Sequence, residues 1–330
     1  MVYKKEGNSK KREESQRKWS NKHKSGLKQC VTGQIQFDGD VLIDKKPAMS
    51  FSLESLPYGL RQRLRELVTP SEAYEFQIAA PKLVGLQPIQ KIQDIYSVSL
   101  SISNETVLCA TDLERYQSLK VSENTLYNAN YSLDIRNFKP QSSYQLIFDH
   151  FRVAPTNVYF NNCSIDASLI QNFANHMKRP VTHLFFNKCT FQSDSMAQVI
   201  SSAFKSLTTL SFNEICPFQR EWLDVFVAAK YSNMRHLFLY GSSVDVLNIN
   251  SDTFMQFYKV QSDSFSLRIR LHDDVDTSKV EQRLNALFGE NFKFQSDCVN
   301  LPQKHVAVMW GSHQLYYFLL EHGFFMLSHI

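Results

Sequence analysis

Apolar and polar residues alternate in the same short pattern at four places in the second half of the chain. The four segments are PTNVYFNNCSI (155–165), VTHLFFNKCTF (181–191), LTTLSFNEICPF (207–218) and MRHLFLYGSSV (234–244). Their alternating stretches start at Val158, Leu184, Leu210 and Leu237, at steps of 26, 26 and 27 residues. Alternation over a few residues is typical of a short β-strand, so we expect one strand in each segment.

Helical patterns fill the intervals between these strands. Apolar residues recur at helical spacing after Asp166, after Ser193 and around Trp222. Each unit is therefore predicted to run strand, turn, helix. Looser units start at Leu133 and Leu267, which extends the array in both directions.

The repeated template resembles the leucine-rich repeat, which has a period of roughly 20–29 residues and Asn or Cys at its turn position. Cys163 and Cys189 occupy that position here. We expect an α/β fold in which an irregular leucine-rich-repeat-like solenoid spans residues 91–290, because such units bury their apolar faces only when stacked. A doubly wound parallel sheet is the structural alternative. Residues 291–330 depart from the template and are expected to form a C-terminal cap.

The residues that alternate with the buried strand positions should form one continuous surface. We expect this concave strand face to bind a protein target, because exposed aromatic residues in a row are unusual on a solvated surface. The predicted binding residues are Tyr159, Asn161, His183, Phe185, Asn187, His236, Phe238 and Tyr240, with Arg268 and Arg270 at one end. The alternative is that a terminal segment covers Phe185 and Phe238.

A second pattern stands near the start of the chain, in SLPYGLRQRLRELVTPSEAY (55–74). Its leucines lie at 56, 60, 64 and 67, a helical spacing, with Ser55 as the expected cap. Thr69-Pro70-Ser71-Glu72 then predicts a second helix that starts with a capping box. We expect residues 49–90 to form a small helical module.

This stretch resembles the start of an F-box, and SLESLPYGLRQRLRELVTPSEAYEFQIAAP is similar to the opening of a nematode family of F-box-related proteins. The resemblance implies docking on the Skp subunit of a cullin–RING ubiquitin ligase through Leu56, Pro57, Leu60, Leu64 and Leu67. Further contact is expected from Tyr74, Phe76 and Ile78. The third-helix position holds AAPKLVGLQP, without the aromatic ending of a usual F-box. The alternative is that the helix pair merely caps the first repeat.

Charge separates the N-terminal end from the rest of the chain. The net charge is +4, and residues 1–30 alone hold ten Lys or Arg and three Glu, a balance of +7. The remaining residues carry −3, which argues against a nucleic-acid-binding body. Residues 1–48 are therefore expected to be a disordered basic tail, and a nuclear-import signal or a weak RNA-contacting arm is the functional alternative.

Other features restrict the compartment and the chemistry. No charge-free apolar run approaches the ~18 residues of a membrane span, and no secretory signal is visible, so six Cys are expected to be free thiols in the cytoplasm or nucleus. We find no phosphate loop, nucleophile elbow or His-Glu-x-x-His motif. His272-Asp273-Asp274 is expected to be a solvated loop, and Ile215 follows the two turn cysteines where a zinc site needs another ligand.

The sequence therefore predicts a non-enzymatic binding protein without metal or cofactor. The expected function is substrate recognition for a Skp–cullin–F-box type ubiquitin ligase. The alternative is a repeat scaffold without ligase coupling.

Overall fold

The computed structural model describes two compact units, Met1–Lys91 and Ile92–Ile330. The described residues are 34–35 and 51–320, apart from 104, 105, 123, 140, 141, 215, 216, 219, 298, 300 and 301. Most of the expected basic tail and the last ten residues of the expected cap lie outside them. Within the tail, strand β1 (Gln34–Ile35) pairs antiparallel with β2 (Phe51–Ser52), so the expectation of a structureless segment 1–48 is wrong for these two residues.

The first unit contains the two predicted helices. A short 3-10 helix, η1 (Leu53–Ser55), precedes α2 (Tyr58–Leu67) and α3 (Pro70–Ala79). The capping box of α3 is confirmed: the Glu72 amide donates to Thr69 Oγ1 (3.3 Å), and the Thr69 amide donates to Glu72 Oε2 (2.8 Å). Ser55 does not cap α2, because it ends η1 and Pro57 takes the N-cap position.

Arginine side chains of α2 hold the segment that follows α3. Arg65 is 7% exposed, and its Nε donates to the Pro88 carbonyl (3.1 Å) while Nη2 donates to Gln90 Oε1 (3.1 Å). Arg61 Nη1 donates to the Val84 carbonyl (2.6 Å). Residues 80–91, all of which the structure describes, form turns and irregular chain and contain no third helix.

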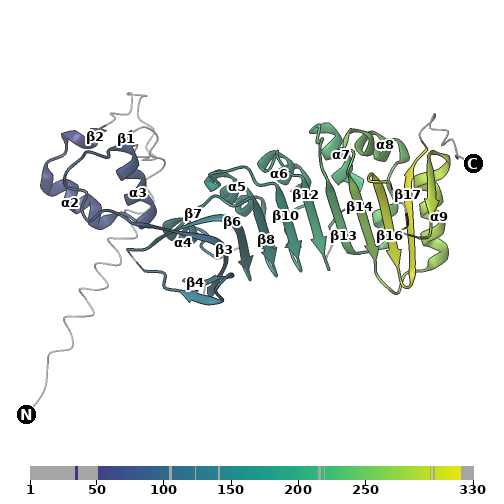
Figure 1. Ribbon diagram of the computed structural model, residues 1–330, viewed down its shortest axis with the longest axis horizontal. Helices are drawn as coiled ribbons and strands as arrows, with labels where there is room; N and C mark the ends of the chain where they lie inside the picture. The colour runs from purple at the N-terminus through teal and green to yellow at the C-terminus, as the bar shows by residue number, and fades with distance from the viewer. Residues whose placement is uncertain are drawn as a thin grey trace, which may run out of the picture. The chain divides into compact units, whose positions relative to one another are not determined.

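The second unit is built on parallel strands that follow one another across the sheet in chain order (Figure 1). They are β6 (Leu126–Arg136), β8 (Asn157–Asn161), β10 (His183–Asn187), β12 (Thr209–Asn213), β13 (His236–Ser242), β14 (Ser266–Leu271) and β16 (His305–Trp310). Val158, Leu184, Leu210 and Leu237 lie side by side in register. The predicted strands and their alignment are therefore confirmed.

Antiparallel strands complete both edges of this 13-stranded sheet. At one end β3 (Ile92–Ser103) runs parallel to β6 and is followed outward by β4 (Val107–Asp112) and β5 (Gln117–Leu119). At the other end the order is β16, β17 (His313–Leu319) and β15 (Phe292–Gln295). β7 (Phe151–Val153) also pairs with β6, and β9 (Ser164–Ile165) pairs with β11 (Thr190–Phe191).

The expected boundary at residue 290 is not where the parallel array ends. His305 pairs with Ser266, and β16 continues the register of β14 as one more parallel strand. HVAVMW departs from the template in its flanks, but its alternation still places Val306 and Val308 in the core. The residues that cap the array are therefore those of the antiparallel strands β17 and β15. Within the described residues, no helix of the repeat type follows these two strands.

Helices connect the parallel strands and lie side by side along one side of them (Figure 1). They are α4 (Gln145–His150), α5 (Ala167–His176), α6 (Met196–Ala203), α7 (Arg220–Ala228), α8 (Ser251–Val260) and α9 (Thr277–Phe288), with the 3-10 turns η2 (Val244–Leu247) and η3 (Gly289–Asn291). Asp166 caps α5 by accepting from the Leu169 amide (2.7 Å). The described part of the chain is thus a mixed α/β fold with a large open sheet.

Aromatic rings fill the layer between the sheet and the helices. Phe160, Phe186 and Phe212 stack across three neighbouring strands with centroids 5.4 Å apart at each step. Phe173 of α5 meets Phe160 edge-on, and Trp222 of α7 meets Phe212 in the same way.

The strand order differs from that of the doubly wound alternative. A doubly wound sheet reverses its strand order at a switch point, whereas the parallel strands here keep chain order from β3 to β16.

Five successive strands of the array, β6, β8, β10, β12 and β13, each have one residue in the left-handed backbone region at or just after their end. These residues are Asn137, Asn162, Lys188, Glu214 and Gly241, at intervals of 25, 26, 26 and 27 positions.

The thiols that follow Asn162 and Lys188 are buried and free. Cys163 Sγ donates to the Ile135 carbonyl (3.4 Å), and Cys189 Sγ donates to the Phe160 carbonyl (3.2 Å). The neighbouring Cys189, together with burial, raises the pKa of the Cys163 thiol. Both cysteines belong to the hydrophobic core.

Gly241→Ala is expected to lower the free energy of unfolding by about 3 kcal/mol, because an added Cβ would lie 2.6 Å from the Glu214 carbonyl oxygen and backbone would have to move. Gly311→Ala is the matched control. Gly311 also has positive φ, but nothing lies within 4 Å of its Cβ position, so only the left-handed penalty of about 1 kcal/mol remains. Urea unfolding measures both, and equal losses would contradict the close approach of the two turns.

Candidate functional site

We name the sheet face that carries the alternate strand residues the open face. The strand register arranges these residues in three rows. The first row is Asn157, His183, Thr209, His236, Ser266 and His305. The second row is Asp134, Tyr159, Phe185, Ser211, Phe238, Arg268 and Ala307. The third row is Arg136, Asn161, Asn187 and Asn213, and it continues with Tyr240, Arg270 and Met309. The structure thus brings all eight predicted binding residues onto one face, while their role stays a prediction.

Stacked rings form an aromatic stripe on the β8 side of the open face. Tyr159 and Phe185 stack with centroids 4.4 Å apart and planes 4° from parallel, and both rings are half-buried. Burial raises the pKa of Tyr159, and the neighbouring Tyr131 and Asp134 add to the shift. Tyr131 in turn stacks on Tyr96 at 4.3 Å. The stripe therefore continues from β10 to β3.

Sequence reasoning missed Tyr96 and Tyr131. The pairing of β3 with β6 shifts register between Ile95 and Ser97, and such an irregularity changes the face on which the following side chains lie. Strict alternation, which identified the other rows, cannot locate a bulge. The aromatic character of Tyr96 and Tyr131 is the sequence feature that could have identified them.

A second cluster lies across β13 and β14. His236 stacks on Phe238 at 5.5 Å, and Phe238 stacks on Tyr240 at 5.8 Å. The Arg268 guanidinium carbon lies 5.7 Å from the Phe238 ring centroid, within the range of a cation–π contact. Ser211 separates this cluster from the aromatic stripe and is only 3% exposed. The open face therefore presents two aromatic groups with a small polar residue between them.

Two of the three first-row histidines, His183 and His236, have a lowered pKa. Burial lowers the pKa of His183, and Arg235 lowers it further. Burial also lowers the pKa of His236, with Arg268, His183 and Arg235 acting in the same direction. Thr209 lies between the two histidines in the register, and no group of three or more potential metal ligands is found among the described residues.

Acid is expected to destabilise the fold through these histidines. Their folded pKa is lowered, so the unfolded chain takes up protons first, and stability falls as pH drops below the usual histidine pKa of about 6.5. Replacing His183 and His236 with Gln should shrink the drop in melting temperature between about pH 7.5 and about pH 5.5. His272→Gln, in the exposed turn after β14, is the control. An unchanged drop in the double variant would contradict the assignment.

The predicted asparagines belong to a hydrogen-bonded ladder. Asn187 Nδ2 donates to Asn161 Oδ1 (3.0 Å), and Asn161 Nδ2 donates to Asp134 Oδ1 (2.6 Å). Arg136 Nε donates to the other oxygen of Asp134 (2.6 Å). Asp134 is 5% exposed, and the ladder satisfies its buried charge. These amides therefore align neighbouring strands, and sequence reasoning did not identify Asp134 as the group that anchors them.

The five residues assigned to docking on Skp differ in exposure. Leu60 and Leu67 are 56% and 59% exposed on α2. Leu56 and Leu64 instead pack against the small core of Leu53, Phe76 and Leu86, and Pro57 is exposed at the start of the helix.

The further contacts expected from α3 also divide. Phe76 is 3% exposed and belongs to the core, so the expectation that it contributes to docking is wrong. Ile78 is 53% exposed and remains accessible. Phe76 follows Ala73 at helical spacing, and both point to the core side of α3.

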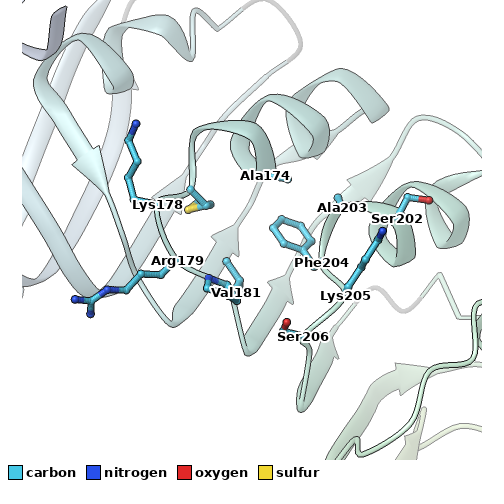
Figure 2. Close-up of a pocket in the computed structure, with 11 residues that line it drawn as sticks. Ala174, Lys178, Arg179, Val181, Ser202, Ala203, Phe204, Lys205 and Ser206 are labelled. Carbon is cyan, nitrogen blue, oxygen red and sulfur yellow. The ribbon is translucent and has the colours of Figure 1, made fainter. Parts of the chain in front are cut away.

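A cleft of about 410 Å³ lies between the chain that enters β10 and the chain that enters β12. Its lining includes Met177, Val181 and Phe204, and Figure 2 shows Lys178 and Arg179 extending away from the Phe204 ring. None of the predicted binding residues lines it. The cleft is also lined by Arg179, Lys205 and Ser206. Because it contains none of the predicted binding residues, the open face remains the candidate site.

Two further expectations concern the loop chemistry and the membrane. His272, Asp273 and Asp274 are all exposed in the turn after β14, as a solvated loop should be. Across the described residues, no helix combines the length and the apolar character that spanning a bilayer requires.

No protein-family model matches the chain, and no curated protein sequence matches it either.

Proposed function

We propose that the chain is a protein-binding adaptor of a cullin–RING ubiquitin ligase. Its first unit docks on the Skp subunit, and the open face of its second unit holds a protein target. The observation that carries this proposal is the pair of half-exposed aromatic clusters aligned by strand register across the open face.

We further propose that the second unit is a leucine-rich-repeat-like solenoid. Support comes from the five left-handed turn residues at intervals of 25 to 27, and from parallel strands that keep chain order across the sheet. The buried thiols at two successive turns fit the Cys position of that repeat. Solenoids of this class use their extended strand face for binding.

Ring stacking makes the open face suitable for protein recognition. The rings of Tyr159 and Phe185 are fixed against each other, so little side-chain entropy is lost when a partner covers them. Tyr, Trp and Arg dominate the energy of protein interfaces, and the open face offers Tyr159, Tyr240 and Arg268. The face also consists of strands already paired on both sides, so a partner contacts side chains and not a free strand edge.

Docking of the first unit rests on the exposed side of α2. Burying Leu60 and Leu67 would contribute roughly 3–6 kcal/mol, at ~1.5–3 kcal/mol for each side chain. Association costs an estimated 4–15 kcal/mol, so the two leucines need support. Tyr58, Val84 and Ile89 are 49%, 66% and 64% exposed in the same unit and supply further apolar area.

Affinity purification of the tagged full-length chain from its own cells tests the proposal. Peptides of Skp and cullin subunits should be enriched together with one or more target proteins. Absence of both ligase subunits would support the second candidate, a repeat scaffold without ligase coupling in the cytoplasm or nucleus. The lack of a third helix within the described residues 80–91 favours that candidate.

A further inference from the structure

We propose that the target segment is an extended acidic peptide whose carboxylates bind Arg235, Arg268 and Arg270 at the β13–β14 end of the open face. This inference deepens the proposed function and rests on it. It names the chemistry of the partner, which neither the repeat pattern nor the docking helix specifies.

The three arginines gather beside the second aromatic cluster. Arg268 and Arg270 alternate on β14 and are exposed, and Arg235 is the exposed residue that precedes His236. Arg268 lies over Phe238, and Arg270 has Asp273 at 4.0 Å, the outer limit of an ion pair. Neither Arg235 nor Arg268 forms an ion pair with a described residue. Their charges are therefore available to a partner.

The surrounding open face adds no compensating acid. None of the described open-face residues on β12, β13, β14 and β16 is acidic. The acid of the second row, Asp134 on β6, is buried and paired with Arg136 at 2.6 Å. The charges of Arg235 and Arg268 thus remain unbalanced by a described acid, and complementary charge is what a specific partner would supply.

Spacing favours an extended peptide. Arg268 and Arg270 are two positions apart on a strand that rises ~3.3 Å per residue, so their backbone positions are ~6.6 Å apart. Carboxylates at alternate positions of an extended peptide repeat at the same distance. Arginine pairs with carboxylate through two parallel hydrogen bonds, which lysine cannot form. An apolar or aromatic side chain of the same peptide can then cover Phe238 and Tyr240.

The charge balance favours a short acidic peptide over a nucleic acid. Beyond residue 30 the chain has 36 − 10 = 26 basic and 32 − 3 = 29 acidic residues, a balance of −3. Nucleic-acid binding depends on neutralising many phosphates along a basic surface. Three arginines match a few carboxylates instead.

Fluorescence anisotropy with labelled ten-residue peptides tests the inference on the full-length chain. One probe alternates Asp with Tyr and Leu, a second has Asn in place of every Asp, and a third probe is a ten-nucleotide oligouridylate. The Asp peptide should bind at least about tenfold more tightly than the Asn peptide, which corresponds to about 1.4 kcal/mol. Arg268→Gln with Arg270→Gln should remove this difference.

Two control variants keep the result interpretable. Arg220→Gln with Lys279→Gln removes the same charge from helices α7 and α9 and should leave the difference intact. Arg268→Lys with Arg270→Lys keeps the charge but loses the paired hydrogen bonds, and it should bind the Asp peptide with intermediate affinity. This second variant also serves if the Gln variant does not fold.

Equal binding of the Asp and Asn peptides would overturn the inference, as would unchanged binding by the Gln variant. Tighter binding of oligouridylate than of the Asp peptide would replace the peptide with a nucleic acid. The proposed function fails separately, if loss of the open-face aromatic residues leaves target capture unchanged. If those residues matter and the arginines do not, the adaptor proposal stands and only the acidic chemistry is wrong.

Discussion

Replacing Leu60 and Leu67 with Asp is expected to remove Skp from the purified complex while the chain stays folded. Both side chains are more than half exposed on α2, and neither packs against the core of Leu53, Phe76 and Leu86. Two carboxylates in a docking surface would be buried without partners, which costs several kcal/mol each. We expect affinity for Skp to fall by more than about a hundredfold, or roughly 3 kcal/mol. Co-purification and circular dichroism measure the two outcomes.

Leu64→Asp is the matched control for this pair. Leu64 lies on the same helix but contacts the small core, so a charge there should unfold the first unit. A loss of helix signal in Leu64→Asp together with a native spectrum in the Leu60 and Leu67 variant would separate docking from stability. If the Leu60 and Leu67 variant keeps Skp, the docking proposal is wrong.

Replacing Tyr159, Phe185 and Phe238 with Thr is expected to abolish target capture while Skp remains bound. Thr keeps β-propensity, and the three rings are only half-buried, so the strands should persist with a moderate loss of melting temperature. These changes remove three aromatic side chains that would anchor the target. Losing one such side chain commonly weakens binding by about 2 kcal/mol or more. Quantitative mass spectrometry of purified complexes measures both partners.

Phe186→Thr is the corresponding control on the opposite face of the same strand. Phe186 is 1% exposed and stacks between Phe160 and Phe212, so its loss should cost about 3–5 kcal/mol and impair the whole second unit. If the three open-face changes destabilise the chain as much as Phe186→Thr does, the rings belong to the core. Target binding would then have to lie elsewhere.

The repeat period was enough to predict the parallel array and its register. A strand with one buried side alternates strictly, and a one-residue slip would bring Val158, Leu184 and Leu210 to the wrong face. The same alternation predicts which residues form the open-face rows. It also identified the turn cysteines, because the left-handed turn recurs at the same point of each unit.

Features that depend on irregular geometry could not be predicted in this way. The bulge in β6, where two residues oppose Tyr96 of β3, brings Tyr96 and Tyr131 together. Strand β16 joins the parallel array although its flanks differ from the repeat. On α2, helical spacing grouped Leu60 with Leu64, but only packing against Phe76 distinguishes an exposed leucine from a buried one. From the sequence, Arg65 is expected to be a solvated charge. In the structure it is buried, because the segment around Pro88 folds over it and accepts its hydrogen bond.

Size-exclusion chromatography with light scattering, applied to the purified full-length chain and a purified Skp subunit, tests the adaptor proposal most directly. The proposal predicts a one-to-one complex that elutes ahead of both components and disappears with the Leu60 and Leu67 variant. Separate elution of the two wild-type proteins at micromolar concentrations would contradict it, since docking of an adaptor on its ligase requires a complex that survives dilution.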